Sequence, residues 1–175
     1  LDGQRNIIGK SMLIEAFDYK IFKDKNTSSD LIVSKLLDNE PDLASGTAMK
    51  TPISDTFTQE QWFDIYKENV EQFKSEIGLT GEIKFHTIWA NVHRRHEKIE
   101  RHNHEGVYVG LHYVKFNSKI HSPTIVRPDL ESRDFYSPET QQDDIMIMSG
   151  DIFHETDANS SDDIRITVAF TFTLE

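Results

Sequence analysis

Cysteine is absent from this 175-residue chain, so neither a disulfide framework nor a thiolate metal site can form. Long apolar runs are missing too: no segment approaches the roughly 18 consecutive apolar residues that a membrane-spanning helix requires. The first ten residues, LDGQRNIIGK, mix charged and polar side chains and lack the pattern of a secretory signal. We therefore expect a soluble protein of a reducing compartment, the cytoplasm of the producing cell or, for a viral protein, of its host.

Basic side chains are scarce relative to acidic ones, with 19 Lys and Arg against 30 Asp and Glu, and the formal net charge is -11. Affinity for a phosphate backbone depends on cationic side chains, so this balance argues against a nucleic-acid partner. The mean hydropathy of -0.55 is typical of a globular protein. We expect a small molecule, a peptide or a protein as the substrate, and neither nucleic acid nor membrane as a partner.

Helical signals dominate the first half of the chain. The clearest helix is predicted from about Gln59 to Ile77, where Thr58 and Gln61 have the spacing of a capping box. An early strand over 15–24 and a short helix over 28–39 are predicted before it. These elements can support a sheet but carry no recognisable chemistry of their own.

Period-two alternation dominates from Glu82 onward, and no helical pattern of useful length separates the candidate strands. Strands without helical crossovers pair antiparallel, which favours a sandwich or jelly roll. In the last segment, apolar residues alternate with Arg165 and several small side chains, so one face is expected to pack on helices and the other to line a polar interior. The predicted fold is mainly β with flanking helices, a single domain in which residues 1–80 support a jelly-roll core over 81–175.

Three of the eight histidines lie in the stretch IERHNHEGVYVGLHYVK, which covers residues 99–115. His102 and His104 are two residues apart, so on an extended backbone both imidazoles project from one face and can converge on one ion. His154 follows the apolar segment DIMIMSGDIF, and a hairpin can return it to the first pair. Because imidazole is a good ligand for iron, zinc, copper and nickel, these three residues are candidate metal ligands.

Arg165 follows His154 by eleven residues, on the polar face of the last predicted strand. A guanidinium on an inward-facing strand requires an anionic partner to offset its loss of hydration. That partner is either a ligand or a nearby carboxylate, such as Asp162 or Asp163.

This pattern resembles the double-stranded β-helix of the Fe(II)/2-oxoglutarate-dependent oxygenases, and more narrowly a small bacterial and phage branch of them. The matching residues are Trp89 and Asn91, His102 and His104, GLHYV at 110–114, and His154 with RITVAF at 165–170. The resemblance implies Fe(II) on the three histidines and 2-oxoglutarate as co-substrate, with Arg165 on its far carboxylate. It also implies hydroxylation of an unidentified substrate, with prolyl or other protein residues among the candidates, and release of succinate and carbon dioxide.

Asn91, His112 and Thr167 are further candidates for contacts with the co-substrate. In the resembling enzymes the position of His112 often holds a tyrosine that binds the far carboxylate beside the arginine, so His112 is expected either to replace that hydroxyl or to be an interior histidine hydrogen-bonded within the fold. The other histidines, His86, His93, His96 and His121, are assigned to surface or packing roles.

The sequence departs from the family pattern at His104, where relatives carry a carboxylate. Either three histidines hold the metal, or Glu100 or Glu105 supplies the carboxylate; strand parity favours His104 because Glu105 points to the opposite face. Three neutral ligands leave Fe(II) with its full +2 charge, whereas one carboxylate lowers it to +1. Two other functions stay open: a three-histidine cupin-type metalloenzyme that does not use 2-oxoglutarate, and a non-catalytic jelly-roll binding protein.

Overall fold

The computed structural model describes residues 11–39, 50–52 and 58–175, which form ten strands and two helices. In chain order these are β1 (Met12–Ala16), β2 (Tyr19–Lys25), α1 (Ser29–Asn39), β3 (Lys50–Pro52), α2 (Gln59–Glu76), β4 (Ile83–His93), β5 (Ile99–His102), β6 (Tyr108–Lys115), β7 (Thr124–Arg127), β8 (Asp144–Ser149), β9 (Phe153–Thr156) and β10 (Arg165–Leu174). Within the described ranges, neither helix is long and apolar enough to cross a membrane.

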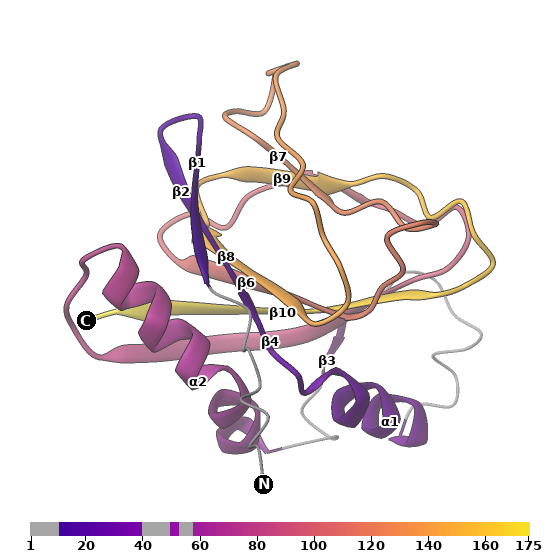
Figure 1. Cartoon of the computed structure of the whole chain (residues 1–175), viewed down its shortest axis with the longest axis horizontal. Helices are drawn as coiled ribbons and strands as arrows, with labels where there is room; N and C mark the ends of the chain where they lie inside the picture. Colours follow the sequence, from indigo (N-terminus) through magenta and orange to yellow (C-terminus); the bar gives the residue numbers. More distant parts are fainter. Residues whose placement is uncertain (1–10, 40–49, 53–57) are drawn as a thin grey trace, which may run out of the picture.

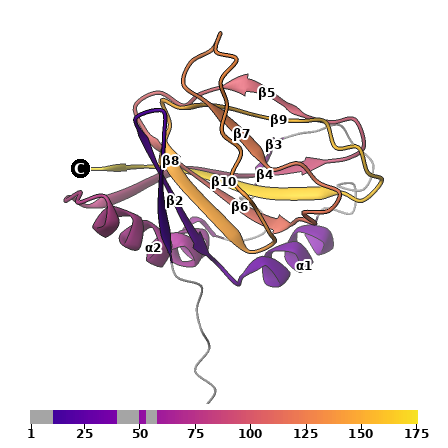
Figure 2. The same cartoon turned by 45° about the horizontal axis from the view of Figure 1, so that its top comes forward.

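Two antiparallel sheets make up the β-structure. Seven strands form the main sheet in the order β1-β2-β8-β6-β10-β4-β3, and three form a second sheet in the order β5-β9-β7. Both helices lie on one face of the main sheet, and the three-stranded sheet lies on the other face (Figures 1 and 2). This arrangement confirms the predicted fold class, a jelly roll with helical support on one side.

Helix α2 forms for the reasons seen in its sequence. The Thr58 hydroxyl accepts a hydrogen bond from the Gln61 amide, and the Gln61 side chain accepts one from the Thr58 amide, so the predicted capping box is present. The buried stripe of α2 packs in one cluster with the apolar face of β10, as predicted. That cluster includes Trp62, Tyr66, Val70, Phe73, Ile166, Val168, Phe170 and Phe172. Burial of each such side chain contributes about 1.5–3 kcal/mol, which holds the helical layer on the sheet.

The prediction of one strand over 15–24 was wrong, because the segment is a hairpin of β1 and β2. Phe17 and Asp18 have φ angles of 54° and 67° and form the tight turn between the two strands. No glycine marks this turn, and the alternating pattern runs through it, so no local feature of the chain indicates the reversal.

Candidate metal centre and adjoining cavity

A cavity of about 180 Å³ lies between the two sheets. Its floor consists of cross-strand neighbours on β4 and β10, in which Trp89 lies opposite Ala169 and Asn91 opposite Thr167. Two residues further along each strand, on the same face, His93 lies opposite Arg165. From the second sheet, the cavity is lined by residues that include His102, Thr124, His154 and Thr156. The polar face predicted for the last strand is therefore the floor of this cavity.

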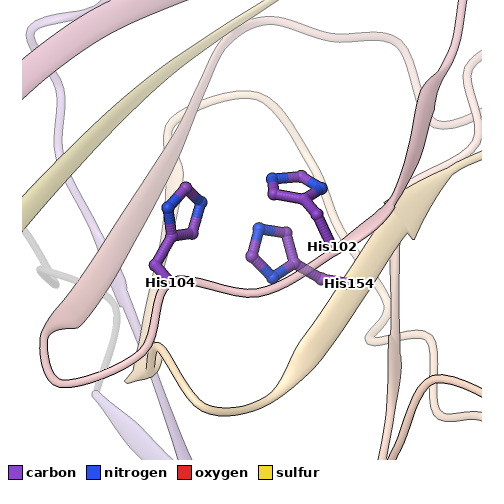
Figure 3. Close-up of side chains that lie close together, drawn as sticks. All are labelled: His102, His104 and His154. Carbon is purple, nitrogen blue, oxygen red and sulfur yellow. The ribbon is translucent and has the colours of Figure 1, made fainter.

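His102, His104 and His154 meet at one side of the cavity and turn their rings toward one another (Figure 3). One ring nitrogen from each lies within 4.8 Å of the other two. His102 ends β5 and is the register partner of His154 in β9, so strand pairing brings these two together. Within the part of the chain that the structure describes, no Asp or Glu belongs to this group, so Glu100 and Glu105 lie outside it.

Backbone carbonyls orient two of the three imidazoles. The Nδ1–H of His102 donates to the Glu100 carbonyl at 2.8 Å, and that of His154 donates to the Ile152 carbonyl at 3.2 Å. A carbonyl only accepts, so the proton is on Nδ1, and Nε2 carries the lone pair through which an imidazole binds an ion. Metal-ligating histidines are commonly held by this kind of contact. The donor set therefore fits a divalent transition metal such as Fe(II).

His104 follows β5, and its position depends on Gly150 in the turn between β8 and β9. The His104 amide donates to the Gly150 carbonyl at 2.7 Å, and the Gly150 amide donates to the Val107 carbonyl at 2.7 Å. A Cβ at position 150 would lie 2.2 Å from the His104 carbonyl oxygen and 2.6 Å from that of Val107. Only glycine fits between these two backbone groups.

Substitution Gly150→Ala is expected to lower the metal affinity about tenfold or more, because the His104 backbone must move and second-layer changes of this kind cost roughly 10–100-fold. Competition with a chromophoric chelator measures the effect. Gly78→Ala is the matched control: it strains a left-handed residue (φ 71°) at the end of α2 and is expected to reduce folding stability alone. Unchanged metal affinity in Gly150→Ala would show that His104 does not depend on this contact.

Arg165 is a buried cation, with 1% of its surface exposed. Its guanidinium donates to the Ser122 carbonyl at 2.5 Å and to Nδ1 of His93, both uncharged. Burial lowers the pKa of Arg165 to about 10, which leaves it protonated at neutral pH. None of the ion pairs among the described residues includes Arg165: Asp162 pairs with Arg95, and Asp163 with Lys115.

The assignment of His112 to the co-substrate was wrong; the alternative, an interior histidine, is correct. His112 is fully buried on the helical side of the main sheet, opposite the cavity. Its Nε2–H donates to the Asn26 carbonyl at 2.9 Å, and its Nδ1 accepts from the Tyr66 hydroxyl at 3.1 Å. Burial lowers its pKa to about 4.

Tyr113, the next residue, is the site residue that the sequence reasoning missed. It is the register partner of Thr167, so it points to the cavity side of β6, and its hydroxyl donates to Thr124 Oγ1 at 2.8 Å. Burial raises the pKa of Tyr113, and the nearby charge of Arg165 counteracts part of that rise. His112 was expected to replace a tyrosine hydroxyl beside the arginine, whereas the structure places the hydroxyl of Tyr113 near Arg165.

The structure places Asn91 and Thr167, both candidates for co-substrate contacts, as direct neighbours on the cavity floor. His93 departs from its assigned packing role, because it lines the cavity and accepts from Arg165. His86 and His96 are exposed, and His121 donates to the Asp163 carbonyl, in keeping with their assigned roles.

No protein-family model and no curated protein matches this sequence. Solved structures do. A prolyl-4-hydroxylase of Pseudomonas putida has a TM-score of 0.59 and 13% identity over 89% of this chain and 92% of its own. HygX of Streptomyces hygroscopicus, solved with nickel and 2-oxoglutarate bound, has a TM-score of 0.59 and 9% identity over 88% and 82%. An oxidoreductase of the 2OG-Fe(II) oxygenase family from Burkholderia pseudomallei has a TM-score of 0.54 and 9% identity over 94% and 73%. The chain therefore has the jelly-roll fold of the 2-oxoglutarate/Fe(II) oxygenases, as its sequence predicted.

Proposed function

We propose that this chain is an Fe(II)- and 2-oxoglutarate-dependent oxygenase that hydroxylates its substrate, with a third histidine in place of the usual carboxylate ligand. One observation carries the proposal. A cluster of three imidazoles lines the cavity, and a buried arginine contacts His93 of the cavity wall and forms no ion pair within the described residues. The imidazole cluster fits a divalent metal, and the buried guanidinium requires an anion.

His102, His104 and His154 would each bind the ion through one ring nitrogen. When bound, Fe(II) supplies the redox chemistry that dioxygen activation requires. Because the three imidazoles are neutral, they offset none of the charge of the ion, and this favours an anionic co-substrate such as a 2-oxo acid.

The cavity floor gives the two ends of such a co-substrate different surroundings. Trp89 lies beside the histidine cluster, with its ring centroid 5.7 Å from that of His104. Arg165 lies four residues from Ala169, the partner of Trp89, along the same face of β10, and its charge acts on the buried hydroxyl of Tyr113. We infer that the 2-oxo acid end binds at the metal and that the far carboxylate binds at Arg165, with Asn91 and Thr167 between them. These residues orient the co-substrate and exclude water from its far end.

Anaerobic titration of the Fe(II)-loaded protein with 2-oxoglutarate tests the proposal, since the chelate has a weak visible charge-transfer band. The wild-type chain is expected to show this band. Arg165→Ala is expected to weaken 2-oxoglutarate binding about 100-fold, because a buried charge-assisted contact is lost. Arg95→Ala, which removes an exposed arginine paired with Asp162, is the matched control and is expected to bind normally. Absence of the band with iron demonstrably bound would overturn the proposal.

The three-histidine cluster also suits a cupin-type metalloenzyme that works without 2-oxoglutarate. In that case Arg165→Ala should leave a turnover that needs no co-substrate intact. A non-catalytic binding protein, in contrast, should purify without stoichiometric metal. Elemental analysis and the anaerobic titration separate the three functions.

A further inference from the structure

His93 ends β4 and lies directly across from Arg165 on β10. Its side chain is 1% exposed and contributes to the cavity wall. Its backbone is fixed as well, because the Asn159 side-chain amide donates to the His93 carbonyl at 3.0 Å. The imidazole is therefore held in the cavity wall, against Arg165.

Hydrogen bonding defines where the proton of His93 is located. A guanidinium can only donate, so Nδ1 of His93 accepts from Arg165 and the ring proton is on Nε2. Burial, followed by the charge of Arg165, lowers the pKa of His93 to about 3, which keeps the ring neutral. His93 is thus a neutral donor at ordinary pH.

Two buried N–H donors lack a hydrogen-bond partner among the described residues: Nε2 of His93, a residue of the cavity wall, and Nε of Arg165, which contacts His93. Leaving a buried donor unpaired costs roughly 1–3 kcal/mol. The two donors belong to residues that are already bonded to each other, and a carboxylate has two oxygens that can accept from both.

We propose that His93 is a specificity-determining residue that donates from Nε2 to the far carboxylate of the co-substrate, beside Arg165, and so selects a dicarboxylic 2-oxo acid. This inference rests on the proposed function. A 2-oxo acid without a second carboxylate, such as pyruvate, makes no contact with His93. Removal of His93 is therefore expected to lower the affinity for 2-oxoglutarate and to leave the affinity for pyruvate unchanged.

The test is anaerobic titration of the Fe(II)-loaded full chain with 2-oxoglutarate and, separately, with pyruvate, followed by the charge-transfer band and by calorimetry. His93→Leu is expected to weaken 2-oxoglutarate binding about tenfold, the value of one hydrogen bond to a charged group. Pyruvate and metal affinities should stay within about twofold, since neither involves the far carboxylate. His93→Asn, whose amide is too short to replace Nε2, is expected to show the same selective loss. His93→Gln, with a longer amide, is expected to recover part of it.

The outcomes are distinct. If the iron-loaded wild-type protein shows no band, the proposed function and the His93 role are both overturned. If the wild-type protein shows the band but the His93 variants lose affinity for both acids equally, or for neither acid, the His93 role alone is overturned. Exposed His96→Leu is the control for histidine removal. Thermal unfolding identifies a variant that fails to fold, and the comparison is then made with His93→Asn and His93→Gln.

Discussion

Replacement of His154 by alanine is expected to lower the affinity for Fe(II) at least about 100-fold, because loss of a direct ligand must exceed the cost of a second-layer change. His154 lies in β9, the central strand of the three-stranded sheet, and is buried. Its removal leaves two imidazoles and no carboxylate to replace it within the described residues. Chelator competition and elemental analysis of the purified protein measure the loss, and turnover of 2-oxoglutarate should disappear with it.

His121→Ala is the control for this experiment. His121 is as well buried as His154, with 5% and 4% of the surface exposed, but it donates to the Asp163 carbonyl and lies outside the imidazole cluster. The variant is expected to keep its metal. Wild-type iron affinity in His154→Ala would show that the ion is held elsewhere in the chain.

The path of the backbone after β5 determines that His104, and not Glu105, joins the imidazole cluster. His104 is fixed by the Gly150 contact, whereas Glu105 is exposed and begins the turn that Gly106 completes with a φ of 77°. A carboxylate at 105 therefore points away from the cluster. The parity argument placed the correct side chain in the cluster because His102 and His104 are only two residues apart, a distance over which strand direction changes little.

Local patterns were sufficient for β10 and for the imidazole cluster, but not for β6. All six central residues of β6 are buried, so alternation of apolar and polar residues does not tell which face of the strand meets the cavity. The face is set by the pairing of β6 with β10, in which Tyr113 lies opposite Thr167 and His112 opposite Val168. This pairing has no mark in the sequence, and it places Tyr113, not His112, on the cavity side of β6.

His93 was missed for a different reason. It opens the charged run HRRHEKIER, which reads as a solvated loop, yet β4 extends to His93 and pairs it with Arg165. The contact joins residues 72 positions apart. Only the pairing of β4 with β10 reveals that these two buried side chains contact each other.

Protonation of His112 is expected to be a large contribution to acid unfolding. The ring is buried and neutral, donating to the Asn26 carbonyl and accepting from Tyr66, and thereby joins the helical layer to β6. Its pKa is about 4 in the folded chain against 6.5 for a free histidine. As the pH falls below 6.5, the unfolded chain takes up the proton first, so folding stability falls until the folded form also protonates near pH 4. The difference corresponds to about 3 kcal/mol in full, of which about 2 kcal/mol is lost between pH 7.5 and pH 5.

Urea unfolding at pH 7.5 and pH 5 measures this loss, and His112→Gln removes the titrating group while keeping an amide in its place. We expect the variant to be less stable than wild type at pH 7.5, because the two hydrogen bonds are weakened, but to lose about 2 kcal/mol less between the two pH values. His86→Gln, an exposed histidine of β4, is the control and should retain the wild-type pH dependence. An equal loss of stability in wild type and His112→Gln would mean that His112 is not held neutral by the fold, and that the acid sensitivity comes from His93 and the other buried groups.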